Sequence, residues 1–323
     1  MEATYIVDCG HHTLKYAGLS KWNRKTVEVL VKERRSECNA YVTDDERLRQ
    51  CVPQLLSGEL RADEELTLIL LLDTFHSQKS KAALLYSCFE QFGCKKVCLH
   101  YTASAGLYAA GETSGLVVDL GYAGVQLTSV QQGTVQTSMS TRLSSVGTRS
   151  VDGELHRLLR GDMTEATLHL VKTHCCSLME RDELVPELTL PDGSVFPYDD
   201  RTRSELHRAT SALLYSTTSS VPDTLRTIYQ KHSICFPDST SWVQLGGGSL
   251  ISGVNEVLTT AMTHPLFRPA HQQLHLKDVT HAPVSGGIIL SQLNVFKSMC
   301  IGVSDYEEYG PDGCLRMQVV DAR

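Results

Sequence analysis

The stretch Leu-Val-Val-Asp-Leu-Gly-Tyr-Ala-Gly, residues 116–124, decides the fold of this 323-residue chain. It begins with a short apolar run that ends in Asp119, and Gly121 and Gly124 follow at once. Glycine lets backbone N–H groups approach a phosphate closely, and a carboxylate can hold a hydrated Mg²⁺ beside that phosphate. The same pattern also begins an ordinary β-hairpin, so a single copy does not establish a nucleotide site.

Two further glycine turns follow apolar strands. Residues 5–10, Tyr-Ile-Val-Asp-Cys-Gly, again place an aspartate, Asp8, after an apolar strand and two residues before a glycine, Gly10. The glycines at 246–248 also follow an apolar strand and lead into an apolar, helix-like segment. Two Asp-x-Gly hairpins in the two halves of a chain predict a duplicated α/β unit. A cleft between the halves would hold a nucleotide phosphate tail, with the third loop against the base and ribose.

The composition is that of an ordinary soluble globular protein, with 41% hydrophobic and 21% charged residues. A formal net charge of −7 argues against a nucleic-acid surface. The longest apolar run, residues 66–72, is strand-sized, so we expect no membrane partner and no direct nucleic-acid partner. The 11 cysteines are scattered without paired ligand sets, which favours a reducing, cytosolic compartment with buried free thiols.

Hydrophobic periodicity predicts alternating strands and helices along the chain. Strands are predicted over residues 5–9, 13–16, 26–31, 66–72, 96–100, 116–120, 125–129, 134–138 and 242–245. Helical spacing is found over residues 48–56, 80–92, 102–110, 151–159, 165–178, 201–215, 221–231, 253–262 and 286–299, with a short tail after the last. Pro191-Asp192-Gly193 predicts the turn of a hairpin over residues 188–196. This order indicates a mixed or parallel α/β sheet.

Several of these motifs point to one family. Gly286-Gly287 opens an apolar helix, and Tyr-Glu-Glu-Tyr-Gly-Pro follows at 306–311. Leu-Pro-Asp-Gly stands at 190–193, and Tyr-Ala-Ala-Gly at 108–111 precedes the Asp119 turn. The chain resembles actin and the actin-related proteins, within the wider class of sugar kinases and heat-shock chaperone ATPases. The triple glycine resembles the family's adenosine loop.

The resemblance implies an α/β, actin-like ATPase fold in which two duplicated mixed-sheet lobes enclose a nucleotide cleft. The first lobe would be residues 1–110 and 283–323, which form subdomain 1 with a reduced subdomain 2. The second lobe would be residues 111–282, which form subdomains 3 and 4. Subdomains 2 and 4 are expected to be shortened, because less chain is available for them than in actin.

The resemblance also implies ATP or ADP with Mg²⁺ in the cleft. Asp8 and Asp119 match the family's metal-side aspartates, which act through water. The residues that match nucleotide-binding positions are Asp8, Gly10, Lys15, Asp119, Gly121, Lys172, Gly246 and Gly247.

Departures from the family pattern weaken this site. His11 and His12 stand where the family has a serine–glycine pair that faces the phosphates, so they either bind phosphate directly or mark a decayed loop. Tyr122 replaces the second loop's second aspartate. Thr102 replaces the glutamine that orients the attacking water, and Gln126 lies at the nearby histidine position. Hydrolysis needs a positioned nucleophile and neutralised charge, so we expect little of it, with nucleotide bound weakly or as a structural ligand.

A protein-binding face is implied as well. The family's barbed end carries an apolar cleft that receives a neighbouring protomer or a partner's helix. The residues that match it are Tyr108, Leu290, Leu293, Val295 and Met299. They can equally be core residues, above all Leu290 and Leu293. The shortened subdomains 2 and 4 form the opposite, pointed end.

These features favour a structural subunit of a cytoplasmic, cytoskeleton-associated assembly whose partners are other actin-like or cytoskeletal proteins. A retained barbed face and a reduced pointed face describe a pointed-end cap, as in the actin-related subunit that ends dynactin's minifilament. Two alternatives stay open. One is a nuclear actin-related protein of a chromatin-remodelling complex, and the other is a slow ATP-dependent conformational switch.

Overall fold

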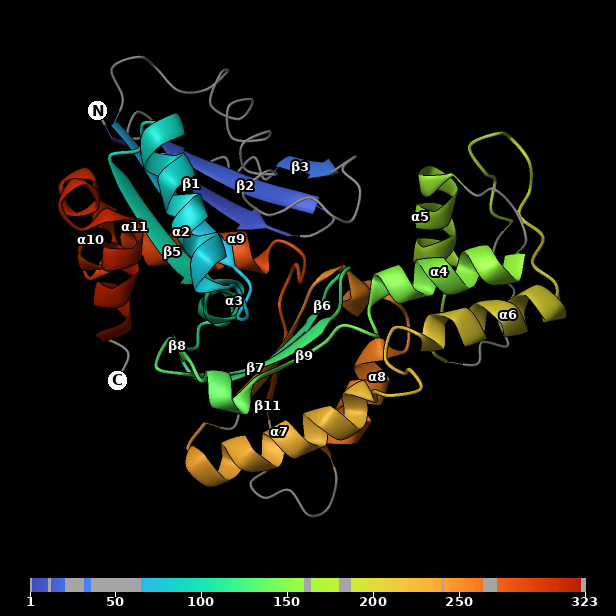
Figure 1. Cartoon of the computed structure of the whole chain (residues 1–323). Helices are drawn as coiled ribbons and strands as arrows, with labels where there is room; N and C mark the ends of the chain where they lie inside the picture. The colour runs from blue at the N-terminus through green and yellow to red at the C-terminus, as the bar shows by residue number, and fades with distance from the viewer. Residues whose placement is uncertain are drawn as a thin grey trace. The chain divides into compact units, whose positions relative to one another are not determined.

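In a computed structural model, the chain forms two compact units, each with its own mixed β-sheet (Figure 1). The first unit comprises Met1–Thr113, Gln132–Val135 and His281–Arg323, and the second comprises Ser114–Gln131 and Gln136–Thr280. The structure describes residues 2–10, 13–20, 32–35, 65–159, 164–179, 187–239, 241–263 and 272–320. The strand predicted over 26–31 and the helical pattern over 48–56 lie outside the described residues.

The first unit contains a six-stranded sheet in the order β12-β5-β4-β1-β2-β3. Its strands are β1 (Glu2–Cys9), β2 (Thr13–Ser20), β3 (Lys32–Arg35), β4 (Glu65–Leu72), β5 (Lys96–Tyr101) and β12 (Ile301–Gly302). β1 is antiparallel to β2 and parallel to β4, which in turn is parallel to β5. β4 is buried along all but its first residue, as expected for a parallel strand that is covered on both faces.

The second unit repeats this arrangement with strands in the order β11-β10-β6-β7, and β9 also pairs with β7. These strands are β6 (Gly115–Leu120), β7 (Val125–Gln131), β9 (Thr141–Leu143), β10 (Ser241–Leu245) and β11 (Gln272–Leu274). β6 is antiparallel to β7 and parallel to β10, which is parallel to β11. The order and directions match those of β5-β4-β1-β2. The duplication predicted from the two Asp-x-Gly turns is therefore present in the strand topology.

The third antiparallel strand predicted over 134–138 is wrong in its extent. β8 (Thr134–Val135) has only two residues and is followed by the one-turn helix η2 (Thr137–Met139). The Ser140 hydroxyl donates to the carbonyl of Gln136 at 2.7 Å and accepts from the Ser129 N–H at 3.1 Å. Since this side chain occupies the Ser129 N–H of β7, a continuous backbone ladder does not form there.

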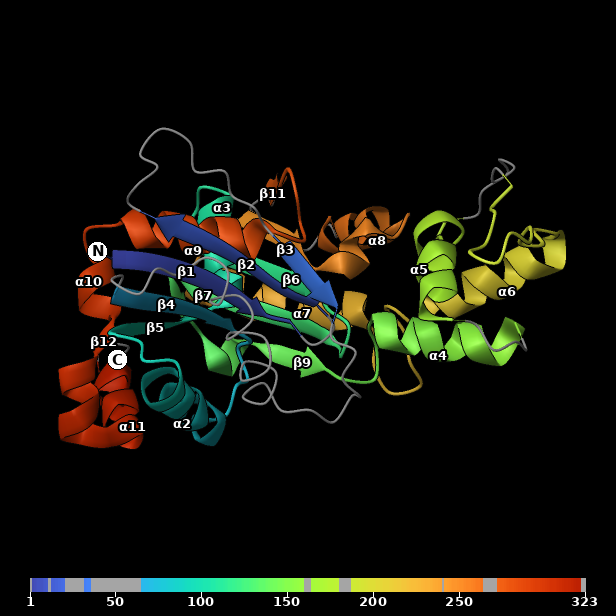
Figure 2. The ribbon, with the colours of Figure 1, turned by 90° about the horizontal axis from the view of Figure 1, so that it is seen from above.

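Helices cover both faces of the first unit's sheet (Figure 2), and a hydrophobic core lies on each face. The helices of this unit are α2 (Gln78–Tyr86), which continues into the π-helix η1 (Ser87–Gln91), α3 (Thr102–Ala109), α9 (Ala282–Gln292), α10 (Phe296–Met299) and α11 (Val303–Val320). One core contains Leu68 and the stacked rings of Phe89 and Tyr306, whose centroids lie 4.6 Å apart. The other contains Ile69 with residues of α3 and α9, because successive strand residues point to opposite faces.

The C-terminal part departs from the predicted single helix over 286–299 with a short tail. α9 already begins at Ala282, and the helix breaks at Leu293, whose backbone is extended (φ −72°, ψ 144°), before α10 begins. The tail is not irregular, because β12 pairs with β5 and α11 follows it. α11 itself is kinked at Gly310, whose φ of 66° suits glycine, just before Pro311.

The second unit carries its helices in two groups (Figures 1 and 2). They are α4 (Thr148–Leu159), α5 (Glu165–His174), α6 (Asp200–Ser211), α7 (Val221–Cys235), α8 (Val254–Met262) and the one-turn η3 (Gly247–Leu250). α7 packs on β7 and α8, whereas α4 packs on α6. The helix predicted over 165–178 ends early, at His174. The predicted hairpin is present, because Thr189 bridges Val195 around Gly193, whose φ is 82°.

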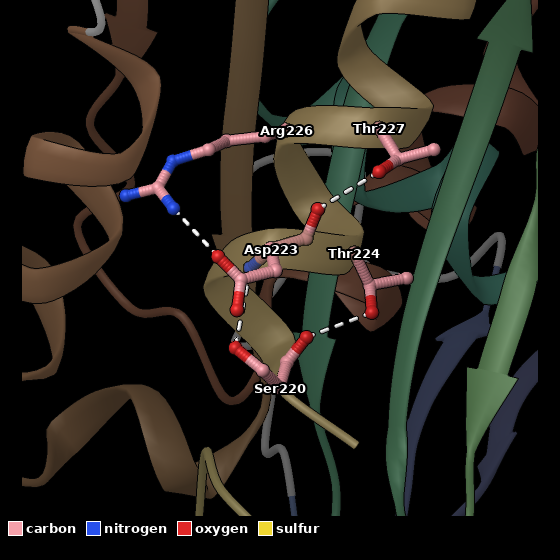
Figure 3. A network of polar contacts seen from close by, with 5 residues as sticks. All are labelled: Ser220, Asp223, Thr224, Arg226 and Thr227. Atoms are coloured by element: carbon pink, nitrogen blue, oxygen red, sulfur yellow. Dashed lines mark hydrogen bonds and ion pairs between the residues drawn. The ribbon is translucent and has the colours of Figure 1, made fainter. Parts of the chain in front are cut away.

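Polar side chains determine where α7 begins (Figure 3). The Ser220 hydroxyl accepts from the Asp223 N–H at 3.3 Å and caps the helix. The Thr224 hydroxyl donates to the Ser220 carbonyl at 2.7 Å, and the Thr227 hydroxyl donates to the Asp223 carbonyl at 3.0 Å. Arg226 pairs with the Asp223 carboxylate at 2.6 Å, but both side chains are exposed, so this pair adds little stability.

We expect Gly286→Ala to destabilise the fold by about 1–3 kcal/mol or more. A Cβ at Gly286 would collide with the backbone carbonyl of Ala105, so α9 would have to move away from α3. Gly153→Ala is the matched control, because Gly153 lies in α4 with nothing within 4 Å of the added methyl. Alanine there should stabilise by about 0.5–1 kcal/mol. Urea unfolding of both variants tests this, and equal effects would contradict the close α3–α9 contact.

Candidate functional site

The first Asp-x-Gly turn joins β1 to β2 and holds a buried ion pair. Asp8 lies opposite Lys15 in the antiparallel register, and Lys15 Nζ is 3.9 Å from Asp8 Oδ2. Burial raises the pKa of the Asp8 carboxyl, and the positive charges of Lys15 and His281 act in the opposite direction. A Cβ at Gly10 would lie 2.5 Å from the Thr13 carbonyl oxygen, so the turn requires glycine. The structure thus brings Asp8, Gly10 and Lys15 together.

His11 and His12 lie in this turn but outside the described residues. Their two alternative roles, as phosphate ligands or as marks of a decayed loop, stay predictions.

The second Asp-x-Gly turn joins β6 to β7. The Gly121 N–H donates to the Gly124 carbonyl at 3.1 Å and closes the hairpin. Asp119 lies opposite Gln126 in the ladder, which places the carboxylate beside the residue at the family's histidine position. The Thr148 N–H donates to the Gly121 carbonyl at 3.2 Å, which ties the start of α4 to the turn.

The glycine loop after β10 packs directly against the end of β6. Gly246 has a φ of 85°, and a Cβ there would lie 2.6 Å from Asp119 Oδ1 and 2.6 Å from the Leu120 carbonyl oxygen. A Cβ at Gly248 would lie 2.9 Å from the same carbonyl. Gly247 differs, because it is exposed and nothing lies within 4 Å of an added Cβ. Asp119, Gly246 and Gly247 therefore lie together within the second unit. Among the three glycines of this loop, only Gly247 has open space beside its backbone.

Thr102 replaces the water-positioning glutamine, and its hydroxyl already has a partner. Thr102 is the first residue of α3, directly after β5, and its Oγ1 donates to the Leu72 carbonyl at 3.1 Å. This bond ties α3 to the end of β4. The hydroxyl proton is therefore used in the fold and is not available to orient a water molecule.

Lys172, predicted on the base side of the nucleotide, pairs with Asp152. Lys172 Nζ lies 2.7 Å from Asp152 Oδ1, and the two side chains are only 16% and 15% exposed. The ion pair joins α5 to α4, so the charge of Lys172 is compensated inside the second unit. The hydroxyl of the next residue, Thr173, donates to the His169 carbonyl at 2.8 Å on the exposed side of α5. Nucleotide binding by Lys172 stays a prediction.

The residues predicted to bind a partner divide into core and surface. Leu290 is 1% exposed and packs in the core, which is the second role that the sequence allowed for it. Leu293 and Val295 are 42% and 57% exposed, and Met299 is partly exposed. Ile289, one helical turn before Leu293, is 41% exposed. We call Ile289, Leu293 and Val295 the α9 apolar patch. The sequence analysis missed Ile289, although its spacing from Leu293 was a usable signal.

Tyr108 is partly buried in the first unit. Its ring stacks on His100, with centroids 5.6 Å apart, and burial raises the pKa of its hydroxyl. A Cβ at Gly133 would collide with the Tyr108 hydroxyl, so that turn also depends on glycine. Burial lowers the pKa of His100 to about 4, so its ring is neutral at physiological pH. Tyr108 therefore connects α3, of which it is part, to His100 in β5 and to the turn at Gly133.

His232 is a buried polar residue that the sequence analysis did not single out. Its Nδ1 lies 2.7 Å from the Ser129 hydroxyl and its Nε2 lies 3.0 Å from the Ser239 hydroxyl. Burial lowers the pKa of this histidine. Since both ring nitrogens are engaged within the second unit, His232 ties α7 to β7 and is not poised for chemistry.

Two duplicated mixed-sheet units, each with an Asp-x-Gly turn at the end of a central strand, define an α/β fold of the actin-like class. Comparison with known proteins makes the assignment specific. The family model described as Actin matches residues 23–181. The chain is 25% identical over 302 residues to Actin-like protein 9 of Rattus norvegicus, which covers 86% of this chain and 72% of that protein. It is 24% identical over 258 residues to Actin-like protein 7A of Bos taurus. That alignment covers 73% of this chain and 57% of that protein.

These matches support a divergent actin-related protein. The chain spans less than two thirds of the second of these relatives. No helix in the described part of the chain is long and apolar enough to cross a membrane.

We expect the stability difference between the wild-type protein and Asp8→Asn to depend on pH. Because burial raises the pKa of Asp8 above the ordinary 3.8, the folded state holds this proton more tightly than the unfolded state. The contribution of the carboxyl to stability is complete below pH 3.8 and is lost as pH rises through the raised pKa. Urea unfolding from about pH 3 to about pH 7 should show the wild type losing stability relative to Asp8→Asn.

Asp199→Asn is the control with the opposite sign. A hydrogen bond from the Thr202 N–H lowers the pKa of Asp199, so its contribution is present above pH 3.8 and is lost on acidification. A difference between wild type and Asp8→Asn that stays constant with pH would show that burial does not perturb Asp8.

Proposed function

We propose that this actin-related protein is a structural subunit of a cytoplasmic, cytoskeleton-associated assembly and docks on another actin-like protein through the α9 apolar patch. The exposure of that patch carries the proposal. Single exposed apolar side chains are ordinary, but Ile289, Leu293 and Val295 lie within one short segment. Aliphatic side chains that are exposed to water close together in the chain favour binding, because a partner that covers them removes apolar surface from water.

The patch is held in one conformation, which favours binding. The Leu293 N–H donates to the Leu290 carbonyl at 3.1 Å, and the Phe296 N–H donates to the Leu293 carbonyl at 3.0 Å. Phe296 and Leu290 are buried directly beside the exposed residues and anchor the turn between α9 and α10. A surface that is already ordered loses less entropy when a partner binds.

Within the assembly we assign the protein to the pointed end of an actin-like filament. The α9 apolar patch lies in the part of the chain that matches the family's barbed end, which would contact the terminal protomer. The segments that match the pointed-end subdomains are short, so the opposite face would not accept a further protomer. A contact between unlike surfaces that cannot repeat ends a filament.

ATP or ADP with Mg²⁺ is proposed as a structural ligand. The donor chemistry fits in part, because the first turn offers a cation and a carboxylate, and the loop after β10 offers open backbone at Gly247 near Asp119. The residues that would hold the ligand are Asp8, Gly10, Lys15, Asp119, Gly121, Gly246 and Gly247. Bound Mg²⁺ would neutralise phosphate charge. Little hydrolysis is expected, since the Thr102 hydroxyl proton is donated to the Leu72 carbonyl, and this disfavours the switch alternative.

The Leu293→Asp, Val295→Asp double variant should abolish capping. Actin filaments whose barbed ends are blocked grow only from the pointed end, so their elongation rate measures binding there. The wild-type protein should slow this growth. Placing two carboxylates in a buried interface should cost about 2 kcal/mol or more, which is at least about 30-fold in affinity. Leu250→Asp is the control, because Leu250 is 69% exposed in the second unit and lies outside the patch.

Equal capping by the double variant would contradict docking through this patch. An electron-microscopy map of the native assembly that showed neighbours at both ends of the protein would contradict the pointed-end position.

Nucleotide content separates a static ligand from a switch. Protein purified gently in Mg²⁺ and then denatured should release about one ATP per chain, unhydrolysed after long incubation. Gly247→Val should lower this content with little effect on folding, because nothing surrounds its Cβ position and its φ is not positive. Gly246→Val, in contrast, should unfold the second unit, since its side chain would clash with Asp119. Release of ADP with measurable turnover would contradict the static ligand and make Gln126 the next residue to replace.

A further inference from the structure

Two cysteines that are distant in sequence meet at one edge of the first sheet. Cys98 lies in β5 and is completely buried, and Cys300 directly precedes β12 and is partly exposed. β12 is antiparallel to β5, with Ile301 opposite Val97. One step further along this register, Cys300 lies opposite Cys98, and the backbone of Cys300 is extended there (φ −84°, ψ 137°).

The hydrogen bonding of this ladder shows that the two cysteines form a close pair. The Val303 N–H donates to the Lys95 carbonyl at 3.1 Å, so Val303 and Lys95 form a hydrogen-bonded pair. Hydrogen-bonded and non-hydrogen-bonded pairs alternate along an antiparallel ladder, which makes Cys300 and Cys98 a non-hydrogen-bonded pair. Such pairs have Cα atoms about 4.5 Å apart, inside the range of about 4.4–6.8 Å that a disulfide spans.

The two thiols already touch. A side-chain hydrogen bond joins Cys98 to Cys300, and the Cys300 thiol also donates to the Phe296 carbonyl at 3.3 Å. The bond to Cys300 and burial raise the pKa of Cys98 well above its ordinary value, so Cys98 is a neutral thiol at physiological pH. An oxidant in solution therefore reaches Cys300 first, because Cys98 is shielded by the core.

We propose that Cys98 and Cys300 form a redox modification site that a disulfide oxidant, such as oxidised glutathione, converts into an intramolecular disulfide. The Cys300 sulfur attacks one sulfur of the oxidant, its proton passes to solvent, and one glutathione leaves as a thiol. The Cys98 sulfur then attacks the Cys300 sulfur, loses its proton, and displaces the second glutathione. The protein loses two protons and two electrons, and the oxidant takes up both pairs.

The bond would join β5 to the chain just after α10. It would close a loop between two residues far apart in sequence and so restrict the unfolded chain, which stabilises the fold. In a reducing compartment such a disulfide is transient and reports oxidation. This inference is independent of the docking and nucleotide proposals, because it rests only on contacts within the first unit.

The test uses the full chain with oxidised glutathione as the probe. After incubation, the remaining thiols are blocked by alkylation, and the protein is digested and analysed by mass spectrometry without reduction. We expect a linked peptide pair that contains Cys98 and Cys300, and loss of alkylation at Cys300. The midpoint of thermal unfolding should rise on oxidation and return after treatment with dithiothreitol.

Three variants make the result specific. Cys300→Ser should abolish the linked pair, and Cys98→Ala should leave glutathione attached to Cys300. Cys235→Ser is the matched control, because Cys235 is exposed on α7, and this variant should form the linked pair as the wild type does. Circular dichroism establishes that each variant is folded. If folded wild-type protein accumulates only the Cys300–glutathione adduct, or links Cys300 to a different cysteine, the proposal is wrong.

Discussion

The contact of α9 with α3 and β1 at two glycines positions the functional features of the first unit. Gly286 meets the backbone of Ala105, and Gly287 faces the side chain of Ile6, so a side chain at either position would push the helix away. His281 at the start of this helix lies close enough to lower the pKa of Asp8, and the apolar patch lies at its other end. One tightly packed helix therefore positions both a residue beside the first Asp-x-Gly turn and the α9 apolar patch.

In the two turns, the aspartates of the family pattern contribute to the structure of their own units. Asp8 pairs with Lys15, and burial raises its pKa, which weakens it as a ligand because a metal requires the deprotonated form. Asp119 packs against Gly246, where the loop approaches so closely that only glycine fits. Each carboxylate therefore packs within its own unit, and its presence in the sequence does not by itself establish catalysis.

The duplicated α/β fold class and the positions of the turns were predictable from sequence, because the turns depend on local signals. Strands end just after Asp119 and just before Gly246 because glycines follow, and glycine adopts turn conformations that other residues disfavour. The break of α9 at Leu293 carried no such signal, because the apolar spacing continues to Met299. After the break the chain leads to β12, which pairs with β5, and this long-range pairing is not visible in the local sequence. The partners of Thr102 and Lys172 were also unpredictable, because each is set by a tertiary contact with another element.

The proposed docking surface and the residues at which the catalytic pattern has changed belong to different parts of this fold. The α9 apolar patch is held by Leu290 and Phe296 in the core and by the glycine contacts of α9. None of these interactions involves Thr102 or Tyr122, the positions at which the catalytic pattern has changed. The threonine at 102 has a structural role instead, because its hydrogen bond to the Leu72 carbonyl ties α3 to the end of β4. A change at Thr102 therefore leaves the α9 apolar patch intact, so the proposed docking does not require the catalytic pattern, and the architecture is the same with or without it.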